Sequence, residues 1–277
     1  MSDHHNVSEH YTHGDLLGAI HAGVTALGRS PETVTVQDLA PVDEFHIGGR
    51  QASEDFLDQL NLGIEHHVLD VGCGLGGASR FVAHRYGSRV TGIDLTAEYV
   101  ETGKVISEWL GLDALIDLHH GSALSLPFHD GVFGGAYMLH VGMNIGDKVG
   151  LCAEVYRVLR PGASFGIYDV MQVADGDLVY PVPWATTPET SSVGGPEQYI
   201  QALEDAGFAI VAQRNRRDFA LAFFEQLRAK AATAGGPPPL GLHILMGESA
   251  AIKVENMIAN ISAGHIAPVE LIARKGL

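Results

Sequence analysis

A glycine-rich segment is the part of the sequence whose residues point most directly to chemistry. It reads VLDVGCGLGG over residues 68–77 and contains Gly72, Gly74, Gly76 and Gly77 after a short apolar run. Glycines at a strand-to-helix turn let the backbone approach a ligand and direct amide N–H groups toward it. Gly72, Gly74 and Gly77 fit the G-x-G-x-x-G pattern of dinucleotide sites, whereas the first three glycines fit G-x-G-x-G. The glycine spacing alone therefore leaves the ligand open.

Two carboxylates accompany this segment. Asp70 lies two residues before the first glycine, where it would repel a pyrophosphate and attract an ammonium group. Asp94 ends the next apolar run, about 20 residues after the loop, and from such a position a carboxylate accepts hydrogen bonds from both hydroxyls of a ribose. The pair indicates a nucleoside ligand and favours one that carries a cationic group.

The elements that must position these residues form an alternating pattern. Beyond the first quarter of the chain, short apolar runs alternate with amphipathic segments, as in a parallel sheet with helices on both faces. Ala78, Phe81 and Val82, for example, have helical spacing. The predicted strands are 67–72, 89–94, 115–120, 133–141, 163–170, 208–215 and 266–274. Right-handed crossovers would place all their C-terminal ends at one edge, where ligands bind in open α/β sheets.

Two segments outside this alternation predict a cap over that edge. Residues 1–60 contain an amphipathic helix over 15–28, and residues 218–264 contain two further helical stretches. Residues 172–198 are too rich in proline and glycine for regular structure, and loops of this length are usually functional. We expect an N-terminal arm with cap helices (1–60), a cofactor-binding core with a substrate loop (61–217), a helical cap insertion (218–264) and a last core strand (265–277).

The composition excludes several classes of protein. Hydrophobic residues make up 46% of the 277 residues and charged residues 18%, which is too apolar for a disordered chain. Lys and Arg number 17 against 33 Asp and Glu, a net charge of −16, so neither nucleic acid nor a membrane surface is an expected partner. No apolar stretch reaches the roughly 20 residues that span a bilayer, and no secretory signal is visible. We expect a cytoplasmic protein.

Disulfides and metal sites are not indicated. Cys73 and Cys152 are expected to be reduced thiols. Five histidines lie among residues 4–21, but their spacing does not match a helical metal site with an acid, so we predict no metal. The apolar surface expected on 218–264 is compatible with a homodimer.

Four motifs, in order, give the chain a family resemblance. The ordered signatures of class I S-adenosylmethionine-dependent methyltransferases are similar to VLDVGCGLGG (68–77), VTGID (90–94), GSALSLPF (121–128) and LRPGASFGIYD (159–169). The resemblance implies a doubly wound, Rossmann-like α/β fold with a seven-stranded, mostly parallel sheet under a helical cap. It also implies S-adenosylmethionine as the cofactor.

The resemblance assigns cofactor contacts to specific positions. The methionine end would meet Asp70 and the glycine loop, the ribose would meet Asp94, and the adenine would stack on Leu95. The family usually has an aspartate where this chain has Ser122, whose hydroxyl is a weaker acceptor for the adenine amine. The full set of implied cofactor contacts is Asp70, Gly72, Cys73, Gly74, Asp94, Leu95, Ser122, Ala123 and His140.

Two residues are candidates for catalysis. Methyl transfer from a sulfonium needs alignment and a dry site, plus a base when the acceptor carries a proton. His140 ends the fourth expected strand and Asp169 ends the fifth, so both are expected to project toward the reactive methyl group. Some sugar and other small-molecule O-methyltransferases that this chain resembles carry a His and an Asp at these places. Equally, His140 can be a packed histidine and Asp169 a loop cap.

The acceptor is expected to meet residues from three parts of the chain. VDEFHIGGRQAS (42–53) is similar to the entrance segment of sarcosine and dimethylglycine N-methyltransferases and would bring Phe45 and His46 to the site, unless it is simply a turn. Tyr180 and Trp184 would form an aromatic wall. The complete predicted substrate set is Tyr11, Phe45, His46, Met143, Asn144, Tyr180 and Trp184.

These observations predict a methyltransferase that acts at an O or N atom of a small soluble metabolite, because a cap of this size encloses a pocket better than it forms an open groove. One alternative is a nicotinamide-dependent oxidoreductase that uses Gly72, Gly74 and Gly77. A second is a cofactor-binding protein without activity, which the departure at Ser122 allows.

Overall fold

A single seven-stranded sheet forms the centre of the computed structural model, which describes residues 10–12, 14–233 and 238–277. The strands are β1 (His67–Val71), β2 (Arg89–Asp94), β3 (Ile116–His120), β4 (Phe133–Leu139), β5 (Leu159–Gln172), β6 (Phe208–Asn215) and β7 (Ile266–Lys275). Their order across the sheet is β3-β2-β1-β4-β5-β7-β6, and the pairs among β1 to β5 are parallel. The predicted seven-stranded, mostly parallel sheet is confirmed.

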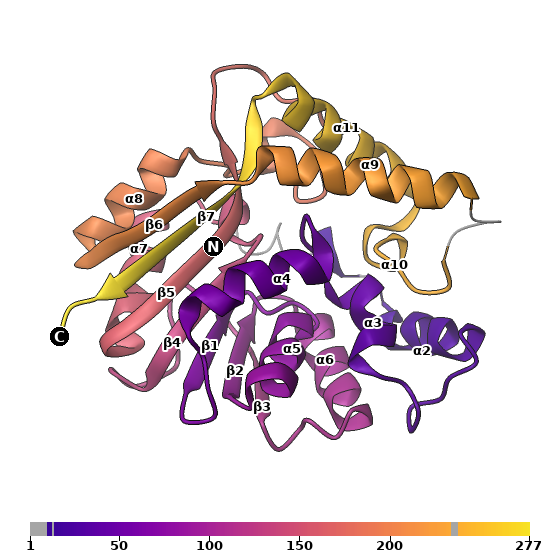
Figure 1. The fold of residues 1–277 in the computed structure, drawn as a ribbon, viewed down its shortest axis with the longest axis horizontal. Coiled ribbons are helices and arrows are strands. Elements are labelled where there is room, and N and C mark those ends of the chain that lie inside the picture. Colours follow the sequence, from indigo (N-terminus) through magenta and orange to yellow (C-terminus); the bar gives the residue numbers. More distant parts are fainter. Residues whose placement is uncertain (1–9, 13, 234–237) are drawn as a thin grey trace.

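The direction of β7 differs from the prediction. This strand is antiparallel to both β5 and β6, so the expectation that all strand C-terminal ends share one edge is wrong for β7. The reason lies in the connection: β6 ends at the ligand edge, and α9 (Arg217–Thr233), α10 (His243–Met246) and α11 (Ala250–Ala263) remain above that edge (Figure 1). The chain therefore re-enters the sheet from the edge at which it left.

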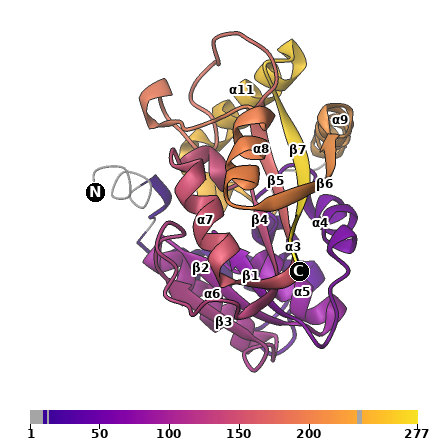
Figure 2. The same cartoon turned by 90° about the vertical axis from the view of Figure 1, so that its left-hand side faces the viewer.

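Helices cover both faces of the sheet. One face packs against α4 (Gly49–Leu57), α5 (Gly77–Tyr86) and α6 (Ala97–Trp109) through a buried cluster that includes Phe56 and Phe81. The other face packs against α7 (Lys148–Val158) and α8 (Pro196–Asp205). Figure 2 shows α7 and α8 on one side of the central strands and α4 on the other. Strands buried on both faces explain the nearly continuous apolar runs in the sequence.

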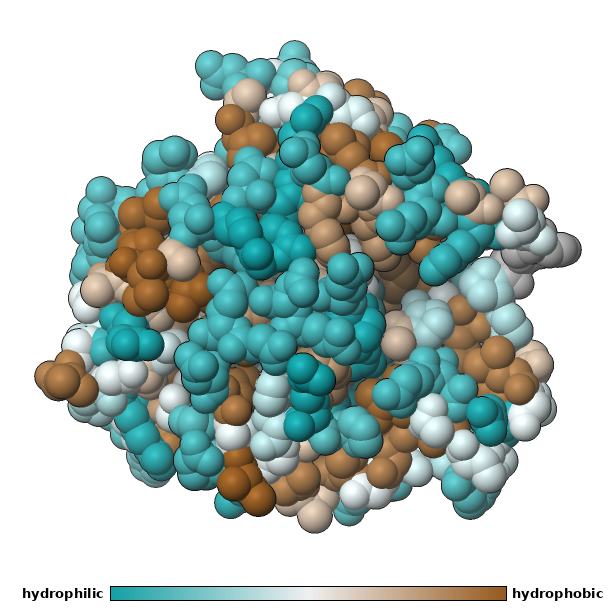
Figure 3. Space-filling model, in the orientation of Figure 1, coloured by the Kyte–Doolittle hydropathy of each residue, from teal (hydrophilic) through white to brown (hydrophobic). Residues whose placement is uncertain are grey.

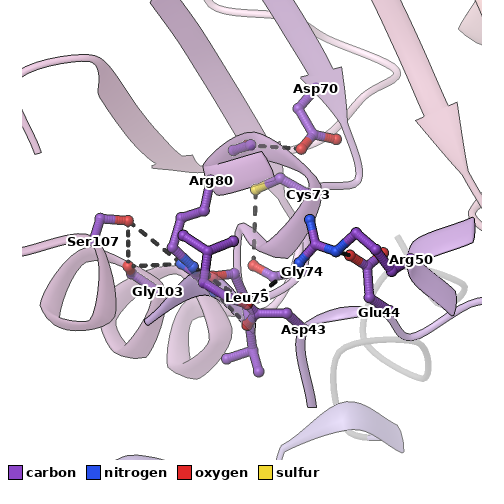
Figure 4. Close-up of polar contacts among 12 residues, drawn as sticks. Asp43, Glu44, Arg50, Asp70, Cys73, Gly74, Leu75, Arg80, Gly103 and Ser107 are labelled. Atoms are coloured by element: carbon purple, nitrogen blue, oxygen red, sulfur yellow. Dashed lines mark hydrogen bonds and ion pairs between the residues drawn. The ribbon is translucent and has the colours of Figure 1, made fainter. Parts of the chain in front are cut away.

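The cap consists of α2 (Leu16–Ala26) and α3 (Val36–Asp43) together with α9, α10 and α11. A buried ion pair ties α3 to the core: the Arg80 guanidinium donates to both carboxylate oxygens of Asp43, at 2.6 and 3.1 Å. The same guanidinium donates to the Leu75 carbonyl in the glycine loop at 2.7 Å (Figure 4). Both side chains of the pair are fully buried. This pair was not predicted from the sequence.

Several expectations concern features other than the fold. Cys73 and Cys152 are both buried and form no disulfide. Within the described ranges, no helix is long and apolar enough to cross a membrane. Those ranges also contain no group of three or more His, Cys, Asp or Glu side chains that could hold a metal ion. Among the N-terminal histidines considered above, His4, His5 and His13 lie outside the described residues.

The buried pair predicts a large stability cost when one partner loses its charge. We expect Asp43→Asn to lower the free energy of unfolding by about 3–5 kcal/mol, because the buried Arg80 guanidinium loses its counter-charge. Urea denaturation at pH 7 measures the loss. Glu101→Gln is the matched control, since Glu101 forms an exposed pair with Lys104 and its loss should be barely measurable. Equal effects of the two substitutions would contradict this assignment.

Candidate functional site

A large cavity lies at the C-terminal edge of the parallel strands, beneath the cap. Its volume is about 1270 Å³, and its lining combines the glycine loop and the ends of β1, β2 and β4 with residues of α9, α10 and α11. Pockets for a drug-sized ligand span roughly 300–1,000 Å³, so this cavity can hold more than one such molecule. Figure 3 shows a hollow on this face of the molecule, between α9 and α3, with hydrophobic residues around it.

Three of the four glycines in the loop have backbone angles that favour glycine, and the fourth is needed for another reason. Gly72, Gly74 and Gly76 have φ angles of 72°, 53° and 77°, in the left-handed region that favours glycine. Gly77 begins α5 outside that region, but a Cβ there would lie 2.3 Å from the carbonyl oxygen of Asp43. The fourth glycine is thus explained by the close approach of α3. The backbone itself follows the G-x-G-x-G pattern.

The amides of this loop do not point outward, as the sequence suggested. The N–H groups of Gly72 and Cys73 both donate to the Ile93 carbonyl, at 2.8 and 3.0 Å. The Gly74 amide donates to Asp94, and the Gly76 amide donates to the Cys73 carbonyl. These four donors are occupied within the protein, so they do not form a phosphate cradle.

Asp70 is a buried carboxylate without a cationic partner. Its Oδ2 accepts hydrogen bonds from the Ser79 hydroxyl at 2.7 Å and the Tyr137 hydroxyl at 3.0 Å. No ion pair to it forms within the part of the chain that the structure describes. Burial raises the pKa of Asp70 to about 7. Such a group gains most from a ligand that brings a positive charge.

Asp94 lies at the end of β2, the strand beside β1, and is held by two backbone amides. The Gly74 amide donates to Oδ2 and the Thr96 amide to Oδ1, each at 2.8 Å. Burial raises the pKa of this carboxyl as well. Because each carboxylate oxygen has two lone pairs, both can still accept a hydroxyl from a ligand. The amides fix the orientation in which they do so.

His140 occupies an unusual backbone position directly after β4. Its φ is 54°, and its amide donates to the Tyr168 carbonyl at 2.7 Å. The ring lies edge-on to the Tyr168 ring, with Nε2 accepting a long 3.5 Å contact from the Ile47 amide. Nδ1 is buried and has no hydrogen-bond partner among the described residues. Burial, followed by nearby His46, lowers the pKa of His140 well below its ordinary value, so the ring is neutral at pH 7.

Asp169 and Tyr180 do not line the cavity, although both were predicted at the site. The Asp169 carboxylate accepts from the Tyr199 hydroxyl at 2.7 Å and from the Val170 amide at 2.9 Å, and burial raises its pKa to about 6. Tyr180 packs with the cluster beneath α11. Of the two residues predicted to be catalytic, His140 lines the cavity and Asp169 does not.

The other predicted site residues are brought together. Residues that line the cavity, as the sequence analysis expected, are Tyr11, Phe45, His46, Asp70, Gly72, Cys73, Gly74, Asp94, Leu95, Ser122, Ala123, His140, Met143, Asn144 and Trp184. The Ser122 hydroxyl oxygen accepts the Leu124 amide at 3.2 Å, and the Asn144 amide group donates to the Tyr11 hydroxyl at 3.4 Å. Their individual roles stay predictions.

Sequence reasoning missed a polar cluster in the 42–53 segment. Glu44 accepts the Ser53 hydroxyl at 2.6 Å and pairs with Arg50 Nε at 2.9 Å, while His46 Nε2 lies 3.0 Å from the Ser53 oxygen. The exposed fraction of Glu44 is 5%, and burial lowers the pKa of His46. The signal available was two adjacent acidic residues before Phe45, followed by His46 and Arg50, in an otherwise turn-like segment.

Comparison with known proteins identifies the core. Residues 69–167 match the family model described as "Methyltransferase domain". This segment is a methyltransferase domain. The chain is 32% identical over 147 residues to sarcosine/dimethylglycine N-methyltransferase of Halorhodospira halochloris, covering 53% of each protein. It is 28% identical over 224 residues to 24-methylenesterol C-methyltransferase 2 of Arabidopsis thaliana, covering 79% of this chain and 58% of that protein.

Solved structures extend the likeness beyond the methyltransferase domain. Geranyl diphosphate C-methyltransferase from Streptomyces coelicolor A3(2) superposes with a TM-score of 0.70, covering 99% of this chain and 98% of that one, at 19% identity. At this identity the likeness shows a shared fold, cap included. The chain spans about half the length of the curated relatives it matches.

The loop geometry of the methyltransferase domain makes a stability prediction. Gly72→Ala places a Cβ at left-handed φ and 2.5 Å from the Val141 side chain, whereas Gly111→Ala meets the same backbone strain with nothing within 4 Å. We expect about 1–2 kcal/mol of destabilisation for Gly111→Ala and a further 1–3 kcal/mol for Gly72→Ala. Chemical denaturation measures both. Adding Val141→Ala to Gly72→Ala should recover part of the difference, and a failure to recover any would contradict the proposed overlap.

Proposed function

We propose that this chain is an S-adenosylmethionine-dependent methyltransferase that acts on a small molecule. The observation that carries the proposal is Asp70, a buried carboxylate without a cationic partner, one strand away from the amide-held carboxylate of Asp94. The ammonium group at the methionine end of the cofactor would supply the missing charge. A pyrophosphate in the same place would be repelled by both carboxylates.

The lining residues fit the rest of the cofactor in order along the sheet edge. Asp94 would accept the ribose hydroxyls, and the side chain of Leu95 would cover the adenine. The Ser122 hydroxyl would accept a hydrogen bond from the adenine amine, more weakly than a carboxylate would. Its oxygen already accepts the Leu124 amide. When bound, the cofactor supplies the activated methyl group; the protein supplies alignment and a site shielded from water.

The glycine loop supports this proposal over an oxidoreductase. The dinucleotide pattern depends on Gly77, whose lack of a side chain is already explained by contact with Asp43. The loop amides that would hold a pyrophosphate donate to Ile93, Asp94 and Cys73 instead. The matched methyltransferase domain supports the same choice.

His140 would position the acceptor. The Ile47 N–H group points at Nε2 of His140. If Nε2 carried a proton, two hydrogen-bond donors would face each other. The contact therefore favours the neutral tautomer with its proton on Nδ1. In this tautomer Nδ1–H donates a hydrogen bond to the acceptor. A general base at Nδ1 would need the opposite tautomer and the loss of the Ile47 contact.

The pKa of Asp70 predicts how binding depends on pH. A cationic ligand needs Asp70 ionised, so below about pH 7 each binding event must release a proton from the free protein. We expect the Kd of S-adenosylhomocysteine, measured by calorimetry, to rise by up to tenfold per unit as the pH falls from 7 to 5. Asp70→Asn should weaken binding at pH 7 and reduce this slope, leaving only the part that comes from Asp94, whose pKa burial also raises.

Asp147→Asn is the matched control, because Asp147 also lines the cavity but its carboxylate accepts the Gly150 amide at the start of α7. This variant should keep the slope of the wild type. NADH should give no heat under the same conditions. Tight binding of NADH together with no binding of S-adenosylhomocysteine would overturn the proposed function.

The role of His140 can be tested with two variants that both tolerate its positive φ. Asparagine and glycine adopt left-handed backbone readily, so neither adds strain at this position. Asn retains a donor near the place of Nδ1 but is not a base, and Gly retains neither. A positioning donor predicts that His140→Asn keeps at least tenfold more kcat/KM than His140→Gly. Equal losses, together with a loss of the wild-type pH profile, would show that the base role is correct.

A further inference from the structure

The half of the cavity beneath α9 and α11 differs sharply in character from the cofactor half. We call it the acceptor chamber and define it by Trp184, Phe223, Phe224, Val254, Met257 and Ile258, all of which line the cavity. We propose that the acceptor chamber binds an uncharged, lipophilic acceptor whose single polar group meets His140 and Asn144. This rests on the proposed function and names its substrate class.

The walls of the acceptor chamber are apolar and come from α9, α11 and the loop that contains Trp184. Phe224 and Met257 are 5% and 6% exposed and belong to one buried cluster with Trp184. Aromatic and thioether side chains gain most from a ligand that removes water from them, and methionine adapts to irregular shapes. A small zwitterion would cover little of this apolar surface, so water would remain in contact with these side chains.

The acceptor chamber as defined contains no charged side chain, whereas charged side chains line other parts of the cavity. Arg50 lines the cavity outside the acceptor chamber and pairs with Glu44 through Nε at 2.9 Å (Figure 4), while its buried Nη1 has no hydrogen-bond partner among the described residues. Arg228 and Glu255 line the cavity but are exposed on their helices. Inside the acceptor chamber, a carboxylate or phosphate on the acceptor would therefore be desolvated without a fixed cation to receive it.

Within the described part of the chain, two uncharged side chains that line the cavity each have a buried polar atom without a hydrogen-bond partner; the buried Nη1 of Arg50, outside the acceptor chamber, is a further such atom. Nδ1 of His140 and Oδ1 of Asn144 are both buried and unpaired among the described residues. The first is a donor in the tautomer that the Ile47 contact favours, and the second is an acceptor. A hydroxyl or a neutral amine N–H group can satisfy both, since it donates and accepts. One such group on an otherwise apolar skeleton matches the cavity.

The proposal predicts a ranking of ligands that differ in charge. The probes are farnesol, farnesyl diphosphate and dimethylglycine, each titrated by calorimetry into the full chain saturated with S-adenosylhomocysteine. We expect farnesol to bind with a micromolar Kd and the other two probes at least tenfold more weakly. The proposal is overturned if farnesol does not bind up to its solubility limit, or if either charged probe binds as tightly.

Paired variants on α11 locate the binding. Val254→Asp places a charge on the chamber wall, whereas Ile252→Asp makes the same change on a neighbouring side chain that is 44% exposed and does not line the cavity. Farnesol affinity should fall at least tenfold in the first variant and stay unchanged in the second. Equal affinities would overturn the assignment. The wild-type ranking decides the substrate class even if Val254→Asp does not fold.

Binding of S-adenosylhomocysteine separates this inference from the proposed function. If that ligand binds but dimethylglycine outcompetes farnesol, the substrate class is wrong and the proposed methyltransferase remains. If S-adenosylhomocysteine does not bind, the proposed function fails, and the acceptor assignment, which depends on it, fails with it. If farnesol nevertheless bound to the free protein, we would conclude that the chamber is an apolar binding pocket that has no methyl donor beside it.

Discussion

The ion pair between Asp43 and Arg80 is the interaction on which the arrangement of the site depends. A single guanidinium binds the carboxylate that ends α3, the Leu75 carbonyl in the glycine loop and the Gly103 carbonyl in α6. The cap, the cofactor loop and the covering helix are thus held by one buried group. Because charged groups in the interior are costly unless fully paired, any shift of α3 would be opposed by the desolvated charge.

The same site also contains two groups whose energetic cost the free protein does not offset. Asp70 is buried without a cation, and His140 adopts a backbone conformation that histidine rarely takes. Both features cost stability in the free protein, and a cationic ligand in the cavity would offset the first. Groups of this kind concentrate where proteins bind ligands.

The sequence predicted features that depend on local pattern. The strands, the glycine loop and the two carboxylates at strand ends all follow from periodicity and turn chemistry, and they lie where expected. The direction of β7 and the orientation of Asp169 depend on how distant segments pack, which no local pattern encodes. The sequence predicted that 218–264 caps the sheet edge but did not identify the side chains of α9 and α11 that line the cavity, because an amphipathic stretch shows that a face is buried and not whether it meets protein or a cavity.

The position of β7 between β5 and β6 has a consequence for how the molecule assembles. β6 is made earlier on the ribosome than β7, yet it has no neighbour in the sheet until β7 arrives. The roof helices α9 to α11 lie between the two strands in the chain, so docking β7 both completes the sheet and closes the roof. Such long-range pairing forms late in folding, and the enclosed compartment is therefore expected to be among the last parts of the molecule to mature during synthesis.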